Sequence, residues 1–419
     1  MPLLRQIRKS PALWLSPVVL LLVVLNTKQA MSLYVEPYWL QASAIASGAV
    51  IILAPACAAL AAWEAGRHRR GLIDQWAPAR TPVGVATSAL VPVWLLAVTG
   101  FTTATAVVLP ATTGVPGSFD LRLIGVAGLV VVAFTAVGWV AGTVARPAYV
   151  VPAMLVGVLL WLVYPPAMDT FWVRHLTGNF QHSCCGIETV IDAHALTAPA
   201  LVAAALLTAA TMTMTAWRSR NRWPLIAGVA VLIAGFVTAQ TLVRDLGPDP
   251  VRPRVDGLSC RDSSGGLRVC VWVEHRDDLA RAMRELTPAV HRLTDAGVPA
   301  PARLTEAAPA PDRGVWTFTI RHDMTPQDVM YSLAVGLAPP SPACAEDGPW
   351  PGAAASVMIV VWFARTAGVP SDHPSLRMEP ELVVSVDKLR TRPLDVQRRW
   401  LAANYAAAAR CDRQPVRAG

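Results

Sequence analysis

The sequence predicts a polytopic α-helical membrane domain of about seven spans, followed by an extracytoplasmic, disulfide-containing α/β domain. Three observations lead to this fold class. Hydrophobic residues form 54% of the 419-residue chain and charged residues only 15%, whereas soluble domains carry about 25% charged residues. Acidic residues are scarce up to position 243 and ordinary beyond it. Six of the seven cysteines fall in segments that we expect on one side of the membrane.

The membrane spans are predicted from uninterrupted apolar segments, because a helix needs about 20 apolar residues to cross the core of a bilayer. The first segment follows the basic residues Arg5, Arg8 and Lys9 and contains Pro17. No small-residue cleavage site follows it, so we expect a retained signal anchor rather than a cleaved signal peptide. The seven expected spans cover residues 11–25, 40–63, 83–109, 121–144, 148–164, 198–217 and 223–243.

The orientation is predicted from the basic residues of the loops, which are enriched on the cytoplasmic side of membrane proteins. If the N-terminus is cytoplasmic, eleven basic residues lie inside: Arg5, Arg8, Lys9, Arg67, Arg69, Arg70, Arg80, Arg146, Arg218, Arg220 and Arg222. The short outer loops then carry three: Lys28, Arg122 and Arg174. We therefore expect a multi-pass protein of the cell membrane with the segment after Val243 outside, in an extracytoplasmic position.

The outer part is predicted to begin with a proline-rich linker at 244–256 and to continue as an α/β domain at 257–419. Asp277 and Asp278 are expected to cap a helix whose apolar face contains Leu279, Met283, Leu286, Val290 and Leu293. Two further strands are expected at 267–273 and 315–320. A helix is expected to start at Thr325 and Pro326 and to continue to residue 337. Two more helices are expected at 353–366 and 393–410.

The cysteines favour an oxidising environment for the outer domain. Cys57 lies within the second span and is interpreted as a small core residue. The other six cysteines all lie in segments expected outside the cytoplasm, and an even number in an oxidising compartment suggests disulfide bonds. These candidates are Cys184, Cys185, Cys260, Cys270, Cys344 and Cys411. The turn signal between Cys260 and Cys270 would place those two opposite each other in a hairpin. A bond between Cys344 and Cys411 would fix the end of the last helix, although the connectivity stays open.

The outer segment "FQHSCCGIETVIDAH" (Phe180–His194) contains several potential metal ligands: His182, Cys184, Cys185, Glu188 and His194. Adjacent cysteines do not easily occupy two vertices of one tetrahedral site, because zinc ligands are usually two to four residues apart. A bond between the neighbours needs an eight-membered ring. We therefore expect no metal here, and expect at least one of Cys184 and Cys185 to be bonded to the outer domain.

Enzymatic motifs are absent from the sequence. It contains no Gly-x-x-x-x-Gly-Lys-Ser/Thr loop for phosphates, no His-Glu-x-x-His zinc motif and no Gly-x-Ser-x-Gly nucleophile elbow. Glu274 and His275 follow a strand, but such a pair more often has a surface or capping role. We expect no catalytic residue, no cofactor and no metal, and hence no enzyme. Because the arginines are dispersed, we also expect no nucleic-acid partner.

The segment "AAWEAGRHRRGLIDQWAPARTP" (Ala61–Pro82) lies in the expected cytoplasmic loop between spans two and three. It resembles the coupling segment of exporter-class ABC transporter permeases, which have a Glu-x-x-x-x-Gly-x-Leu-like sequence there. Glu64, Gly71 and Leu72 are the matching positions, with Glu64 and Gly71 farther apart than in that pattern. The layout of residues 1–217 is also similar to that family, and especially to permease-like proteins of actinobacteria with an outer C-terminal domain. A seventh span and the outer domain follow where the usual family ends.

The resemblance implies a permease-like subunit of an export system, embedded in the lipid bilayer. It would depend on a separate ATP-binding subunit and form a homo- or heterodimer with another permease. The implied ATPase-coupling surface consists of Glu64, Arg67, Arg69, Arg70, Gly71, Leu72 and Trp76. The alternative is a non-transport protein, in which the helices anchor an extracytoplasmic binding, sensing or accessory domain. Neither the substrate nor the direction of transport follows from the sequence.

Overall fold

The computed structural model divides into two compact units, a helical unit up to Pro253 and a C-terminal unit from Arg254. They are described separately below. The structure describes residues 10–32, 37–70, 81–181, 184–219, 221–263, 265–307, 314–346, 348, 350–377 and 379–418.

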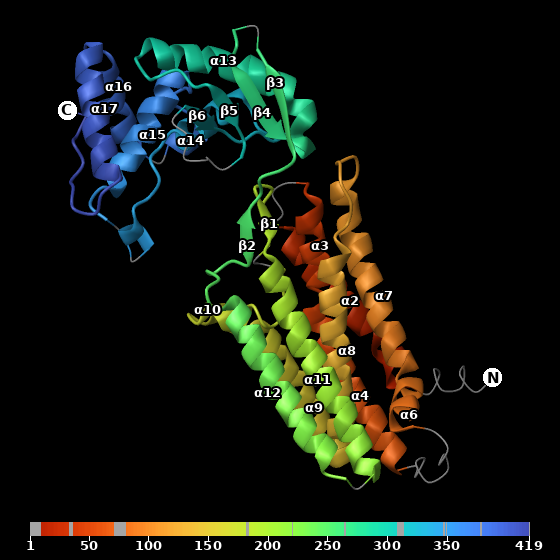
Figure 1. The fold of residues 1–419 in the computed structure, drawn as a ribbon. Coiled ribbons are helices and arrows are strands. Elements are labelled where there is room, and N and C mark those ends of the chain that lie inside the picture. Colours follow the sequence, from red (N-terminus) through yellow and green to blue (C-terminus); the bar gives the residue numbers. More distant parts are fainter. Residues whose placement is uncertain are drawn as a thin grey trace. The chain divides into compact units, whose positions relative to one another are not determined.

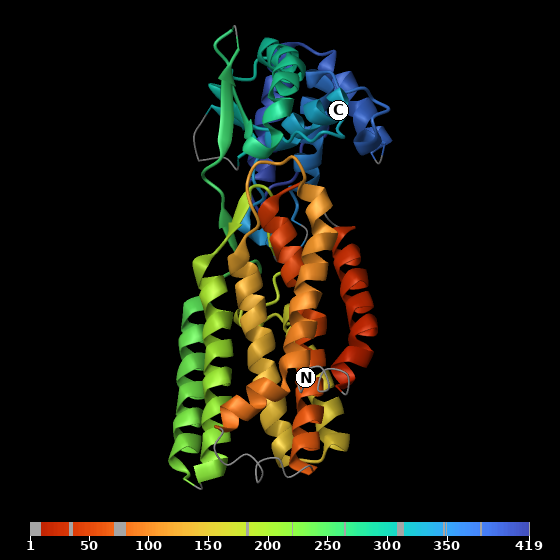
Figure 2. The ribbon, with the colours of Figure 1, turned by 90° about the vertical axis from the view of Figure 1, so that its right-hand side faces the viewer.

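The helical unit contains, among its described residues, seven helical segments that are long and apolar enough to cross a membrane. Figures 1 and 2 show their helices running side by side along one direction. Their bounds are α2 (Pro11–Met31), α3 (Trp39–Ser47) with α4 (Val50–Arg70), α7 (Val91–Val108), α8 (Leu121–Val144), α9 (Pro147–Val163), α11 (Ala193–Ser219) and α12 (Trp223–Val243). The number of expected spans agrees with this count.

Four of these segments differ from the sequence expectation. Helix α2 continues to Met31, beyond the expected end at residue 25, and α11 starts at Ala193, before the expected start at residue 198. Helix α4 continues to Arg70, well past the expected end of span two at residue 63, because its last turns pack against other helices. The expected span at 83–109 is divided at Leu90 into α6 (Pro82–Ala89) and α7. Pro92 lies in the first turn of α7, where its missing N–H is tolerated, so a new helix starts there.

Helix α4 is the central helix of the unit. It packs against α8, α9, α7 and α2, and most of its span is buried. A Cβ atom on Gly138 or Gly142 of α8 would lie only 2.2 Å from the carbonyl oxygen of Ala58 or Ala62, respectively. Small residues spaced four apart allow this close approach of two helix backbones, as in many membrane helix pairs.

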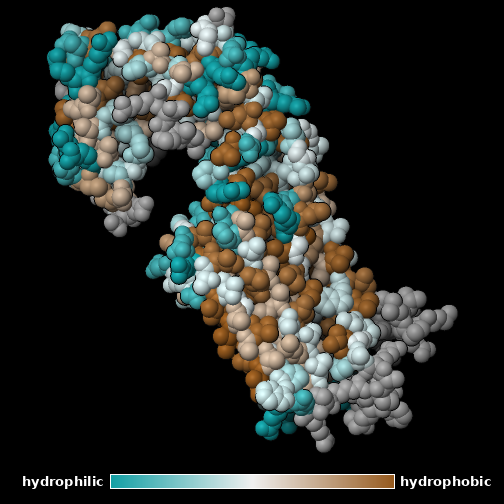
Figure 3. Space-filling model, viewed as in Figure 1, coloured by the Kyte–Doolittle hydropathy of each residue, from teal (hydrophilic) through white to brown (hydrophobic). Residues whose placement is uncertain are grey.

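The outer surface of the helical unit is largely apolar. Helix α12 exposes Ile226, Val229, Ile233 and Val237, each more than half accessible. Figure 3 shows hydrophobic side chains over the sides of the helices in this view. A soluble protein rarely exposes such a large contiguous apolar surface, whereas the hydrocarbon core of a bilayer would cover it.

Two short strands belong to the helical unit. Strand β1 (Thr189–Ile191) follows α10 (Phe171–Arg174), and β2 (Val251–Pro253) follows α12. They pair antiparallel, with Val190 opposite Arg252. The segment expected as a linker at 244–256 therefore includes a strand with a partner. Such a short pair carries little periodicity, which explains why the sequence analysis did not predict it.

The C-terminal unit contains a four-stranded sheet of order β3-β4-β5-β6. The strands are β3 (Leu258–Asp262), β4 (Arg268–Trp272), β5 (Arg303–Thr305) and β6 (Val315–Thr317). Strands β3 and β4 form the expected antiparallel hairpin, in which Cys260 lies opposite Cys270 and is bonded to it. Strands β4, β5 and β6 are parallel, so their carboxyl ends meet at one edge of the sheet.

The helices of the C-terminal unit lie close to their expected positions. They are α13 (Leu279–Asp295), α14 (Pro326–Gly336), α15 (Ala353–Ala367), α16 (Pro380–Arg390) and α17 (Leu394–Ala408). Leu279, Leu286, Val290 and Leu293 of α13 are buried, as the periodicity predicted. Helix α16 was not predicted. Helix α15 packs against α13, α14, α16 and α17 and is the apolar centre of this unit.

The disulfides correct one expectation. Cys344 is bonded to Cys411, as considered from the sequence, but Cys184 and Cys185 are bonded to each other. The expectation of a bond between this pair and the outer domain is therefore wrong. The reason is that the four cysteines of the C-terminal unit are used in bonds within that unit, and both Cys184 and Cys185 are buried in the helical unit.

Candidate functional site

Glu64 lies buried near the C-terminal end of α4, which we call the Glu64 end of the bundle. Its carboxylate accepts a hydrogen bond of 2.8 Å from the hydroxyl of Ser10, the N-cap residue of α2. The guanidinium of Arg67 lies 3.4 Å from its other oxygen, and only 3% of the Glu64 side chain is exposed. A buried carboxylate needs such partners. Glu64 therefore joins the start of α2 to the end of α4.

The last turn of α4 also holds two neighbouring helices. Arg69 donates hydrogen bonds of 3.2 Å to the carbonyl oxygens of Thr143 and Val144, at the end of α8. A Cβ atom on Gly66 would lie 2.3 Å from the ring of Pro147, the first residue of α9. The ends or beginnings of four helices thus meet at the Glu64 end.

The candidate coupling residues therefore differ in their accessibility. Arg67 is partly exposed and Arg69 and Arg70 are exposed. Glu64, in contrast, is buried and does not present its carboxylate to a partner protein. The other three coupling candidates, Gly71, Leu72 and Trp76, lie outside the described residues. The sequence alone did not reveal that Glu64 has an internal partner, because Ser10 is 54 positions away.

A polar segment, residues 175–181 and 184–191, lies at the opposite end of α4, which we call the Gln181 end. The Gln181 side chain is 5% exposed. It accepts a hydrogen bond of 3.1 Å from the side-chain amide of Asn26 in α2 and donates one of 3.4 Å to the Asn26 carbonyl. A Cβ atom on Gly48, between α3 and α4, would lie 2.3 Å from the Gln181 oxygen. Gln181 thus occupies a notch that exists because residue 48 has no side chain.

The same segment contacts further helices. Gly178 has a positive φ of 74° and packs closely against Val130 of α8 and Pro199 of α11. The side-chain amide of Asn179 donates a hydrogen bond of 3.3 Å to the carbonyl oxygen of Leu162 in α9. Residues 178–181 of the polar segment therefore connect α2, α4, α8, α9 and α11 at the Gln181 end.

The exit from α12 is fixed by two neighbouring residues at the end of α10. Arg174 donates hydrogen bonds of 2.9 Å to the carbonyl oxygens of Pro166 and Pro248. The Nε2 atom of His175 lies 2.9 Å from the carbonyl oxygen of Gly247. Burial lowers the pKa of His175, opposed in part by the hydrogen bond to Gly247. These contacts hold residues 247–248, just before β2, against the polar segment of the same unit.

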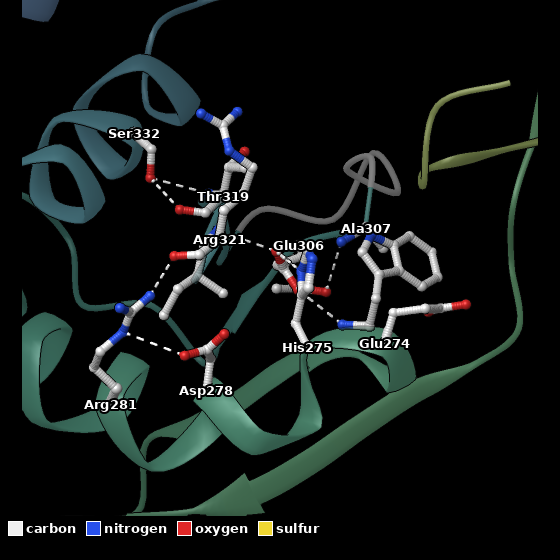
Figure 4. A network of polar contacts seen from close by, with 12 residues as sticks. Glu274, His275, Asp278, Arg281, Glu306, Ala307, Thr319, Arg321 and Ser332 are labelled. Carbon is white, nitrogen blue, oxygen red and sulfur yellow. Dashed lines mark hydrogen bonds and ion pairs between the residues drawn. The ribbon is translucent and has the colours of Figure 1, made fainter. Parts of the chain in front are cut away.

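In the C-terminal unit, Glu306 lies at the carboxyl edge of the parallel strands (Figure 4). Its carboxylate accepts hydrogen bonds from the backbone N–H groups of Trp272 (2.8 Å) and Ile320 (3.0 Å). The Nδ1 atom of His275 lies 3.0 Å from the same carboxylate. Glu306 follows β5, while its partners follow or end β4 and β6. The carboxyl edge is where ligands commonly bind in α/β proteins, but here the carboxylate is used internally.

A second ion pair lies beside this network. Arg254 lies 3.1 Å from the Glu274 carboxylate and 4.6 Å above the ring of Trp272. The Glu274 and His275 side chains are 4% and 5% exposed. The interpretation of Glu274 and His275 as a surface or capping pair is therefore wrong, because both have buried partners far away in the sequence. Both side chains therefore help to fix this edge of the sheet.

Metal-ligating side chains do not gather in the part of the chain that the structure describes. Among those residues, no group of three or more His, Cys, Asp or Glu could hold a metal ion. His182 of the candidate ligand set lies outside them. His194 pairs with Asp192 at 3.2 Å, next to the start of α11.

Comparison with known proteins identifies one family. Residues 269–411 match the family model described as a domain of unknown function (DUF7224). The match lies within the C-terminal unit and covers about a third of the chain. No curated protein and no solved structure matches the chain. The family therefore supports the C-terminal unit as a recurring domain and names no activity for it.

Proposed function

We propose that this chain is a permease-like membrane subunit of a transport system that depends on a separate ATPase. The Glu64 end of the bundle would face the cytoplasm and receive the ATPase on the segment after α4. The C-terminal unit would lie outside the cytoplasm. A second copy or a related permease would complete the transport path.

The observation that carries this proposal is the position of α4. One of its ends is joined to α2 through the hydrogen bond between Glu64 and Ser10. At the other end, Gly48, just before α4, packs against the Gln181 side chain. The helix between is buried and packed against four others. Packed elements of this kind move as rigid bodies rather than deform continuously. A displacement of α4 by a partner bound after Arg70 would therefore be transmitted to the Gln181 end.

The orientation is supported by charge and redox chemistry. Arg67, Arg69 and Arg70 lie at the Glu64 end, and Arg146 and Arg222 start the helices α9 and α12 there. Basic residues favour the cytoplasmic side of a membrane. The two disulfides within the C-terminal unit favour an oxidising compartment for that unit.

Association with an ATPase can be tested by purifying the full chain from its native membranes in mild detergent. We expect an ATP-hydrolysing subunit to co-purify. The variant Arg70→Glu should release most of it by reversing a charge in the coupling segment. Arg222→Glu reverses an exposed charge at the same end but outside that segment, and should retain it. If no ATPase accompanies the wild-type chain at any salt concentration, the proposal is wrong.

Transmission through α4 needs a separate measurement on the reconstituted complex. We expect Gly48→Ala to leave ATPase association intact, because position 48 is at the far end of α4. A methyl group there would displace Gln181 and should change the rate of ATP hydrolysis severalfold. Gly128→Ala is the control, since a Cβ atom at that position meets nothing within 4 Å. Equal rates for both variants would argue against α4 as the link.

The second candidate is a protein in which the helices anchor an extracytoplasmic binding or sensing domain without transport. The observation that favours it is the family match, which is confined to the C-terminal unit. This unit also has a continuous hydrophobic core of its own. A chain that binds a ligand through the C-terminal unit, but associates with no ATPase, would support this function over the first.

A further inference from the structure

A pocket of about 360 Å³ lies in the C-terminal unit, next to the Glu306 network but without Glu306 or His275 in its lining. It opens between the chain that follows β6, helix α14 and the turn η5 (Pro374–Leu376). Pockets that bind small molecules are typically about 300–1,000 Å³. The lining residues are Thr319, Arg321, Asp323, Met324, Asp328, Tyr331, Ser332, Val335 and Ser375.

One wall of the pocket offers hydrogen-bond donors without an acceptor in the described part of the chain. The Nε atom of Arg321 lies 3.3 Å from Asp323, which leaves the two terminal nitrogens of its guanidinium. The hydroxyl groups of Tyr331 and Ser375 also have no hydrogen bond to a described residue. A guanidinium fork and two hydroxyl groups in the lining of one pocket are suited to a carboxylate, which accepts two parallel hydrogen bonds from arginine.

Two other polar residues of the lining, Asp328 and Ser332, are already used. Asp328 accepts hydrogen bonds from the backbone and hydroxyl of Thr325 (2.8 and 2.7 Å), and His373 Nε2 lies 3.0 Å from it. The Ser332 hydroxyl donates to the Thr319 carbonyl at 2.8 Å and accepts from the Thr319 N–H at 3.0 Å. Figure 4 shows Ser332 beside Thr319. In the described part of the chain, the groups that remain for a ligand are the donors of Arg321, Tyr331 and Ser375, together with the Thr319 hydroxyl and the second carboxylate oxygen of Asp323.

An apolar wall lies beside these donors. The ring of Tyr331 is stacked on His373, with centroids 5.4 Å apart and planes 24° apart, so its position is fixed. Val335, one turn farther along α14, is 48% exposed although it is apolar. Met324 completes this side of the lining. An aliphatic group of a ligand would cover this surface, while the carboxylate met the guanidinium.

We propose that this pocket binds a monocarboxylate with a short apolar substituent, such as an N-acylated apolar amino acid or the carboxyl-terminal residue of a peptide. Arg321 and the two hydroxyl groups would hold the carboxylate, and Tyr331 and Val335 the apolar group. A phosphate dianion fits less well, because Asp323 and Asp328 add negative charge to the same pocket. This proposal is independent of coupling to an ATPase.

The test is isothermal titration of the full chain in lipid nanodiscs with matched probes. N-acetyl-leucine represents the free acid, N-acetyl-alanyl-leucine represents a peptide end, and N-acetyl-leucinamide lacks the carboxylate. We expect both acids to bind, and the amide to bind about tenfold more weakly or worse, since a charge-assisted hydrogen bond is lost. The tighter of the two acids identifies the source. Equal binding of acid and amide, or no binding of either acid at millimolar concentration, would overturn the proposal.

Variants assign the binding to this pocket. Arg321→Gln should weaken acid binding at least about tenfold, and Arg321→Lys, which keeps the charge but lacks the fork, should recover only part of it. Arg399→Gln is the control, because Arg399 is 71% exposed on another helix and pairs only with nearby Asp395. Intact Cys344–Cys411 and unchanged circular dichroism would show that each variant is folded. Wild-type affinity in a folded Arg321→Gln variant would contradict the proposed site.

Discussion

At the scale of single residues, buried charged groups connect distant parts of the chain within each unit. Glu64 and Glu306 are both acidic residues whose carboxylates are almost completely buried. Each is neutralised or hydrogen-bonded by partners from other elements: Ser10 and Arg67 for the first, His275 and two backbone N–H groups for the second. Removing one partner from such a set lowers the free energy of unfolding by more than the intact set contributes to it. The reason is that the remaining polar group stays buried without a partner.

The substitution Glu306→Gln tests this at the sheet edge. A glutamine has one acceptor oxygen, and its NH₂ group would face either the Trp272 or the Ile320 N–H. We expect a loss of about 2 kcal/mol in the stability of the C-terminal unit. Hydrogen–deuterium exchange of the full chain should show faster exchange of peptides that contain Trp272 and Ile320. Glu381→Gln is the control, since Glu381 is exposed in the first turn of α16; equal effects would contradict the role of Glu306.

Asp328 predicts a pH dependence. Its burial would raise its pKa, but hydrogen bonds from Thr325 and His373 outweigh this and lower the pKa below its ordinary value. A carboxyl group with a lowered folded-state pKa stabilises the fold above about pH 4, and this contribution is lost as the pH falls through the lowered pKa.

We therefore expect Asp328→Asn to lower stability at neutral pH and to reduce the loss of stability as the pH falls below about 4. Acid unfolding of the full chain in nanodiscs, followed by near-ultraviolet circular dichroism, measures this. Asp395→Asn removes an exposed acid that pairs with Arg399 on α17 and should leave the acid transition unchanged. A steeper transition in Asp328→Asn than in the wild type would contradict the prediction.

At the scale of elements, the close contact of α4 and α8 depends on two glycines. A Cβ atom on Gly142 would lie 2.2 Å from a backbone oxygen of α4, and a backbone atom cannot move aside as a flexible side chain can. Gly142→Ala should therefore separate the helices and cost about 1–3 kcal/mol. Gly128→Ala, on the same helix with open space around it, should be neutral or slightly stabilising. Thermal unfolding in detergent compares them; similar midpoints would contradict this packing.

The elements also show what could be predicted from the sequence. Long apolar segments and the periodicity of α13 depend on local composition, so the spans and most helices of the C-terminal unit were found within a few residues. The buried environments of Gln181 and Glu64 were not predicted. They depend on Asn26, Gly48 and Ser10, which are distant in the sequence. The same holds for Glu306, which carries no motif and gains its role only when three strands meet.

At the scale of the whole molecule, the chain combines a helical unit suited to a bilayer with a C-terminal unit that has its own core and disulfides. The proposed orientation gives these units different surroundings. Segments at the Glu64 end would be exposed to a reducing cytoplasm, while the disulfides of the C-terminal unit would form outside it. This arrangement makes a prediction for intact cells.

Single cysteines at Arg70 and Arg399 test this orientation with a thiol reagent that does not cross membranes. We expect Arg399→Cys to be labelled in intact cells and Arg70→Cys only after permeabilisation, because both positions are exposed in their own units. The wild-type chain is the control, since its one free cysteine among the described residues, Cys57, is buried. Labelling of Arg70→Cys in intact cells, with Arg399→Cys protected, would reverse the topology.

The notch at Gly48 constrains how this protein can change over evolutionary time. Any side chain at position 48 would collide with Gln181, including its Cβ atom at 2.8 Å, so shortening residue 181 alone does not make full room. Positions 48 and 181 are therefore expected to vary together, with glycine at 48 wherever residue 181 carries a side chain. Such covariation between two sites 133 positions apart (181 − 48 = 133) would mark the polar segment as an inherited part of the bundle.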